Sequence, residues 1–136
     1  MKTKEICKQY LDALNEGSLE NVLSLFDSDA MVNSPLYGEV PAKTFYTDLF
    51  VDTNRSDTKL LNVFSSDRGK LTVALHFHYS WTLKNEKVVE FECVDVIEIN
   101  PDTNKISKLK IIYDTAPLRA DFNESKSSNQ HGQQQH

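Results

Sequence analysis

The sequence predicts an α+β fold, in which helices pack on one face of a single curved, mostly antiparallel sheet. Up to about residue 50, apolar residues recur at helical spacing, which indicates three N-terminal helices. From about residue 58 onward, apolar and polar residues alternate, which indicates strands. The length of 136 residues suits one domain, which we expect over residues 1–122.

A glycine separates the first two predicted helices. The apolar residues of the first helix recur at Ile6, Tyr10, Ala13 and Leu14. Gly17 suits the left-handed conformation that ends many helices, and Ser18 suits the cap of the next one. The apolar residues of that second helix are Leu19, Val22, Leu23, Leu25 and Phe26. After a short strand over residues 30–33, Pro41 opens a third helix that extends to about Phe50.

The second half of the chain is predicted to form strands, followed by a polar tail. The strands are expected over residues 59–64, 71–83, 88–99 and 106–113, and short turns join them into an antiparallel meander. Residues 123–136 contain no apolar side chain. Such a segment buries too little apolar surface to offset the entropy lost on ordering, so we expect a disordered tail.

Composition narrows the range of functions. The net charge is −5, and an acidic surface repels phosphate backbones, so we expect no nucleic-acid partner. No apolar run approaches the roughly 18 residues of a membrane span, and the charged N-terminus does not resemble a signal peptide. We therefore expect a cytoplasmic protein without a membrane partner, in which Cys7 and Cys93 are reduced. No phosphate loop, paired-cysteine motif or nucleophile elbow is present, so no cofactor is expected.

The central hairpin brings polar and aromatic residues together. A turn centred between Asn85 and Glu86 gives the facing pairs His76–Asp95, His78–Cys93 and Ser80–Phe91, all on one face. The opposite face then carries an aromatic stripe of Phe77, Tyr79 and Trp81. This stripe is too aromatic to face water, so we expect a homodimer across it.

Several segments resemble ketosteroid isomerase and its relatives. They are Gln9–Glu20, then Leu25-Phe26 with the acidic turn before Ala30, and Phe91–Asn100 followed by Lys105-Ile106. These proteins belong to the nuclear-transport-factor-2-like superfamily, which includes the SnoaL-like polyketide cyclases, and the resemblance spans roughly residues 5–122. It implies a cone, in which a strongly bent sheet wraps around a helix and encloses an apolar pocket. It also implies dimers across the outer sheet face. It does not identify the reaction, because one fold hosts many chemistries.

The resemblance also suggests site residues. Ketosteroid isomerase uses an aspartate base and an oxyanion hole made of a tyrosine and a protonated aspartate. Tyr10 is similar in position to that tyrosine, and Asp95 to the protonated aspartate. The position of the base falls on Ser34, and a serine cannot abstract a proton at neutral pH without an activating partner.

Two histidines are candidates for the missing base. A histidine that faces Asp95 would have a fixed tautomer, so His76 or His78 could move the proton. A metal set of His76, His78 and Asp95 is a weaker interpretation, and we expect no metal. For these residues and for Tyr10, a purely structural role in the core or pocket wall is the alternative. The pocket wall is expected to include Ser34, Phe45, Phe91 and Cys93.

These residues support three hypotheses. The first is an isomerase or cyclase that acts on a small apolar carbonyl compound, with Tyr10 and Asp95 stabilising an enolate. The second is a non-catalytic protein that binds a small ligand in the same pocket, and the third is a dimeric interaction module. Burial should raise the pKa of Asp95 above its ordinary value of about 3.9, unless a charged His76 opposes it.

Overall fold

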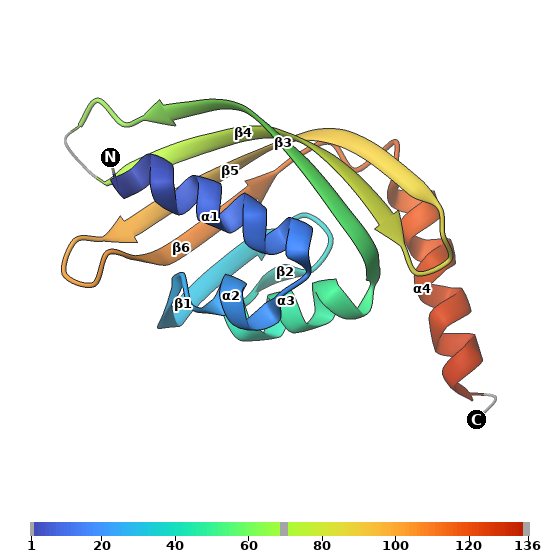
Figure 1. Ribbon diagram of the computed structural model, residues 1–136. Coiled ribbons are helices and arrows are strands. Elements are labelled where there is room, and N and C mark those ends of the chain that lie inside the picture. Colours follow the sequence, from blue (N-terminus) through green and yellow to red (C-terminus); the bar gives the residue numbers. More distant parts are fainter. Residues whose placement is uncertain (1, 69–70, 135–136) are drawn as a thin grey trace.

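The computed structural model describes residues 2–68 and 71–134, which form an α+β fold with a six-stranded sheet and four helices (Figure 1). The strand order is β2-β1-β6-β5-β4-β3. The strands are β1 (Phe26–Ser34), β2 (Gly38–Pro41), β3 (Thr53–Ser65), β4 (Thr72–Leu83), β5 (Val88–Asn100) and β6 (Lys105–Ile112). All neighbours are antiparallel except β1 and β6, which run parallel, so the predicted fold class is confirmed. The sheet is twisted but not strongly curled, in contrast to our expectation, and it stays open at β2 and β3.

The helices α1 (Lys2–Glu16) and α2 (Leu19–Leu23) meet at the predicted glycine. Gly17 has a φ of +66°, and its amide donates to the carbonyl of Leu14 while the amide of Ser18 donates to Ala13. These two hydrogen bonds are the Schellman arrangement, and the Ser18 hydroxyl accepts from the amide of Asn21 as a helix cap. Both predicted caps are confirmed.

Strand β2 was not predicted, and the other elements that follow differ from the prediction mainly in length. Helix α2 has five residues, and Phe26, which we expected inside it, begins strand β1. Helix α3 (Ala42–Val51) follows Pro41 as predicted and buries Phe45, Tyr46 and Leu49. Helices α1 and α3 lie on the same face of the sheet (Figure 1), where their apolar side chains join the core.

Helix α4 (Arg119–Gln134) occupies the segment that we expected to be a disordered tail. The first turns of this helix are anchored by Leu118 and Phe122, which are buried. The Phe122 ring lies 5.6 Å from Trp81 and 5.7 Å from Tyr37, measured between ring centroids. Tertiary packing of these early residues therefore supports a helix that its own polar sequence does not indicate. Residues 135–136 of the predicted tail lie outside the described residues.

The β4–β5 hairpin has a different register from the one predicted. Three residues, 84–86, form its loop, because the amide of Leu83 pairs with the carbonyl of Lys87. Glu86 takes a left-handed φ of 72°, which is the usual third residue of such a loop. The odd loop shifts the pairing by one residue and gives Leu75–Asp95, Phe77–Cys93, Tyr79–Phe91 and Trp81–Val89.

This shift joins the aromatic face of β4 to the face of β5 that carries Asp95. Phe77, Tyr79 and Trp81 are buried inside the chain, so our expectation that this stripe meets a second chain is wrong. His76 and His78 lie on the outer face instead.

Cys7 and Cys93 are both buried free thiols. Among the described residues, no helix is long and apolar enough to cross a bilayer.

Candidate functional site

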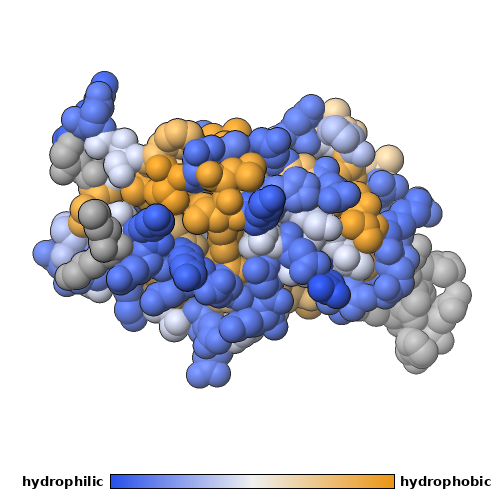
Figure 2. Space-filling view, turned by 45° about the horizontal axis from the view of Figure 1, so that its top comes forward, coloured by the Kyte–Doolittle hydropathy of each residue, from blue (hydrophilic) through white to orange (hydrophobic). Residues whose placement is uncertain are grey.

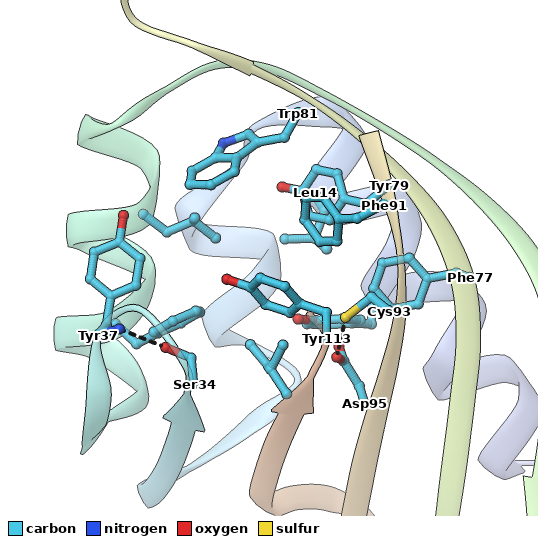
Figure 3. A pocket seen from close by; sticks show the side chains of 14 residues that line it. Leu14, Ser34, Tyr37, Phe77, Tyr79, Trp81, Phe91, Cys93, Asp95 and Tyr113 are labelled. Carbon is cyan, nitrogen blue, oxygen red and sulfur yellow. Dashed lines mark hydrogen bonds between the residues drawn. The ribbon is translucent and has the colours of Figure 1, made fainter. Parts of the chain in front are cut away.

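A pocket lies between the sheet and the helices α1 and α3 (Figure 3). Fourteen side chains line it, and eight of them are aromatic. Such walls suit a flat, largely apolar molecule. The free space within them is about 40 Å³, which is room for a few water molecules and no more.

Six of the eight residues predicted for the site meet in this pocket. Strands β4 and β5 present their inner faces to it, and α1 lies across them. The lining contains Tyr10, Ser34, Phe45, Phe91, Cys93 and Asp95. His76 and His78 do not line it, because the hairpin register points them to the other face.

Asp95 is the polar end of the pocket. Its side chain is buried, and the thiol of Cys93 donates to its Oδ1 over 3.1 Å. Burial raises the pKa of Asp95 to about 7, although hydrogen bonding from Cys93 and Tyr10 opposes the shift. Near neutral pH the carboxyl is therefore divided between its protonated and ionised forms, which suits a group that both gives and takes a proton.

A pair of tyrosines stands beside Asp95. The hydroxyls of Tyr10 and Tyr46 form a hydrogen bond of 2.7 Å, and both side chains are fully buried. Burial raises the pKa of each tyrosine well above its ordinary value, so both hydroxyls stay neutral. When Tyr46 donates to Tyr10, the proton of Tyr10 is free for Asp95 or a ligand. Our sequence reasoning missed this role of Tyr46, although its place on the apolar face of α3 signalled burial.

The two histidines belong to a separate surface. His76 accepts from the Asn62 amide at Nδ1 (3.1 Å), and its Nε2 lies 2.7 Å from Glu92. His78 Nε2 lies 3.5 Å from a carboxylate oxygen of Glu90. The predictions that His76 faces Asp95 and that His78 faces Cys93 are therefore wrong. In residues 2–68 and 71–134, no three histidine, cysteine or acidic side chains are placed to hold a metal ion.

Ser34 has a structural partner in place of an activating base. Its hydroxyl accepts from the backbone amide of Tyr37 over 3.0 Å, which closes the turn between β1 and β2. Among the described residues, the pocket lining contains no histidine or lysine, and its only carboxyl is that of Asp95. Any proton that side chains in this pocket move near neutral pH must therefore pass through Asp95.

The other end of the pocket has its own polar contacts, which the sequence did not reveal. The Tyr37 hydroxyl donates to the buried carboxylate of Asp52 over 2.6 Å, and Lys126 reaches the same oxygen over 3.2 Å. Trp81 donates its indole N–H to Thr53 over 2.7 Å. These partners are far apart in the sequence, so no local pattern could have linked them.

Comparison with known proteins gives matches of structure only. No family model and no curated protein matches the sequence. SalBIII, an epoxide hydrolase/cyclase-like enzyme of pyran ring formation in salinomycin, matches at a TM-score of 0.71 and 19% identity, over 83% of this chain and 91% of SalBIII. The BvnE pinacolase of Penicillium brevicompactum matches at a TM-score of 0.71 and 12% identity, over 96% of this chain and 95% of the pinacolase.

A third match is an NTF2-like protein of unknown function from Cytophaga hutchinsonii, with a TM-score of 0.67 and 15% identity, over 85% of this chain and 93% of that one. Structures described as SnoaL-like and as having a ketosteroid isomerase-like fold match as well. The chain therefore has the fold that NTF2-like, SnoaL-like and ketosteroid isomerase-like proteins share, as its sequence resemblance implied.

Proposed function

We propose that this protein of NTF2-like fold is an isomerase or cyclase that acts on a small, largely apolar carbonyl compound. The observation that carries the proposal is Asp95, a buried carboxyl in an aromatic pocket with a pKa raised to about 7. The aromatic walls would hold the apolar body of the substrate. The polar end, where Tyr10 and Asp95 lie, would receive its carbonyl oxygen.

In this mechanism Tyr10 stabilises charge on the substrate oxygen. The Tyr10 hydroxyl, backed by Tyr46, donates a hydrogen bond to the carbonyl oxygen. As a proton leaves the neighbouring carbon, electrons shift onto that oxygen and form an enolate. A fixed donor in a site without bulk water stabilises this charge more in the transition state than in the ground state.

Asp95 is the group that moves the proton. In its ionised form it takes the proton from the carbon next to the carbonyl, and in its protonated form it returns that proton at another position. The Cys93 thiol donates to Oδ1 of this carboxyl. The sequence resemblance implied a donor role for Asp95, but Ser34 is no base and the histidines lie elsewhere, so we assign proton transfer to Asp95.

Deuterium exchange tests this assignment without knowledge of the natural substrate. In D₂O, the wild-type protein should accelerate exchange of the α-protons of 2-tetralone, a flat bicyclic ketone, followed by proton NMR. Asp95→Asn should lower the protein-dependent rate about 1,000-fold and Tyr10→Phe about 100-fold, because the first loses the proton carrier and the second an oxyanion donor. His76→Ala is the matched control and should keep the wild-type rate. A large loss in His76→Ala would contradict the assignment.

A non-catalytic ligand-binding protein is the second candidate. It is favoured by the pocket lining of the described residues, which offers aromatic walls for an apolar molecule but Ser34 at the position of the isomerase base. In this case 2-tetralone should bind, with a change in Trp81 fluorescence, but its α-protons should exchange no faster than in buffer. The exchange experiment therefore separates the two candidates directly.

We also propose that the protein is a homodimer, joined through the outer sheet face. Figure 2 shows an apolar region there, bordered by hydrophilic residues. By strand register we assign it to an outer patch of Phe64, Ala74, Val94, Val96 and Ile112. Phe64 is 56% exposed and Ile112 47% exposed, so the patch exposes much apolar surface to water in a lone chain.

Phe64→Glu should convert this dimer into a monomer, because it places a charge in an apolar isologous contact. Sedimentation velocity at about 100 µM measures the change. Val51→Glu, at an exposed apolar residue on α3, is the matched control and should leave the dimer intact. Wild-type protein that sediments as a monomer would refute the proposed dimer, and with it the dimeric interaction module.

A further inference from the structure

We propose that helix α4 is a lid, which closes the end of the pocket opposite Asp95 and must move before a ligand can enter. In Figure 3, Trp81 and Tyr37 lie at the end of the pocket away from Asp95. Phe122 of α4 packs against both of these rings, at 5.6 Å and 5.7 Å between centroids. Phe122 is itself buried, so it covers the two side chains that form this end of the wall.

The small size of the pocket supports such a movement. About 40 Å³ of free space accepts a few water molecules, whereas pockets that bind small organic molecules usually hold about 300–1,000 Å³. The walls on the other sides are strands of the sheet and the helices α1 and α3, which supply most of the buried core, whereas α4 contributes Phe122 to it. Helix α4 lies at one end of the sheet, and its C-terminal half extends away from the body (Figure 1).

Apart from the buried packing of Phe122, the contacts that hold α4 against the rest of the chain are polar. Lys87 in the hairpin pairs with Asp121 over 3.4 Å and with Glu124 over 3.2 Å. The backbone amide of Asn85 donates to the Ser125 hydroxyl over a long 3.4 Å. Exposed ion pairs and long hydrogen bonds contribute little net stability. The lid is therefore held by one buried aromatic ring and by weak polar contacts, which can break while the rest of the core stays folded.

One ion pair connects the lid directly to the pocket wall. The Nζ of Lys126 lies 3.2 Å from Oδ2 of Asp52, and the same oxygen accepts the hydroxyl of Tyr37, a lining residue. The Lys126 ammonium also lies 5.8 Å from the ring centroids of Tyr37 and Phe122. The Asp52 side chain is nearly buried, whereas that of Lys126 is 42% exposed. Lid opening would therefore leave a buried carboxylate without its cation. This contact is the latch of the lid.

Acrylamide quenching of fluorescence tests the lid without any ligand. Trp81 is the only tryptophan of the chain, and Phe122 covers it, so its accessibility to acrylamide reports on the lid. Lys126→Met removes the latch but leaves Phe122 and Trp81 unchanged, so any new exposure of Trp81 requires motion. We expect its quenching constant to rise at least twofold over wild type. Salt at about 1 M should shift wild type in the same direction, because it screens the ion pairs.

Lys8→Met is the matched control, since Lys8 is an exposed lysine on α1. It should quench like wild type, and near-UV circular dichroism should show that both variants keep the folded core. Equal quenching in Lys126→Met, Lys8→Met and wild type would overturn the lid.

Ligand entry rests on the proposed function, but lid motion does not. With 2-tetralone as the probe, stopped-flow mixing should give faster association for Lys126→Met than for wild type. Faster quenching with no binding of 2-tetralone would leave the lid standing and count against the proposed function. Faster quenching with an unchanged association rate would overturn the role of α4 in admitting the ligand.

Discussion

Replacing Asp95 by asparagine should stabilise the folded protein at about pH 8, by up to about 4 kcal/mol. The carboxyl is buried in the pocket, and its pKa rises from 3.8 to about 7 on folding. The shift is about three pH units, and each unit corresponds to about 1.4 kcal/mol. At about pH 8 the wild-type protein must keep an ionised carboxylate in an apolar site, whereas asparagine is neutral there.

The sign of the pH dependence follows from proton binding. Between about pH 4 and pH 7, folded Asp95 holds a proton that the unfolded chain has largely lost. The folded state then binds more protons than the unfolded state, so stability falls as the pH rises through this range. The contribution of Asp95 is fully present below about pH 4 and is lost above about pH 7.

Urea unfolding at about pH 4.5 and pH 8 measures the free energy of unfolding of the wild type and of Asp95→Asn. The difference between the two proteins cancels the contributions of other titrating groups. Asp12→Asn makes the same charge change on the exposed face of α1 and serves as control. A difference between the wild type and Asp95→Asn that stays constant with pH would contradict the raised pKa. A stability gain combined with loss of ketone exchange would be typical of a functional group that strains its fold.

Much of the fold could be predicted because local signals agree with the final structure. Gly17 and Ser18 mark a helix boundary by their own conformational and capping preferences. The long strands carry a clear alternation, as in β4, where every second residue from Val73 to Leu83 is buried. Tyr10 and Asp95 could be placed in one pocket because both positions match the resemblance to ketosteroid isomerase.

The register of the central hairpin could not be predicted, because it depends on a single residue of loop length. Glu86 has no special preference for its left-handed φ of 72°, so the sequence did not reveal a three-residue loop. This one-residue error exchanged His76 with Leu75 as the neighbour of Asp95. Helix α4 was missed for another reason: its stability comes from the packing of Phe122 on residues distant in sequence, and not from its own composition.

The face assignment of β4 can itself be tested by two adjacent substitutions. Leu75 is fully buried opposite Asp95, whereas His76 points to the outer face beside Glu92. Leu75→Ala should lower the free energy of unfolding by about 2–5 kcal/mol, because it removes buried apolar surface and leaves a cavity. His76→Ala should lower it by about 1 kcal/mol or less, because it removes only two exposed polar contacts, with Asn62 and Glu92. Urea unfolding of the two variants gives both values.

The opposite register makes the opposite prediction. If His76 faced Asp95, His76→Ala would break a buried polar pair and would be the more damaging change, while Leu75 would lie outside. A second measurement strengthens the test. The cavity left by Leu75→Ala adjoins Asp95, and water that enters it would lower the pKa of that carboxyl by restoring its hydration. Carboxyl carbon NMR of Asp95 should therefore show a lower pKa in Leu75→Ala than in His76→Ala, since only the first substitution opens the site that the buried carboxyl occupies.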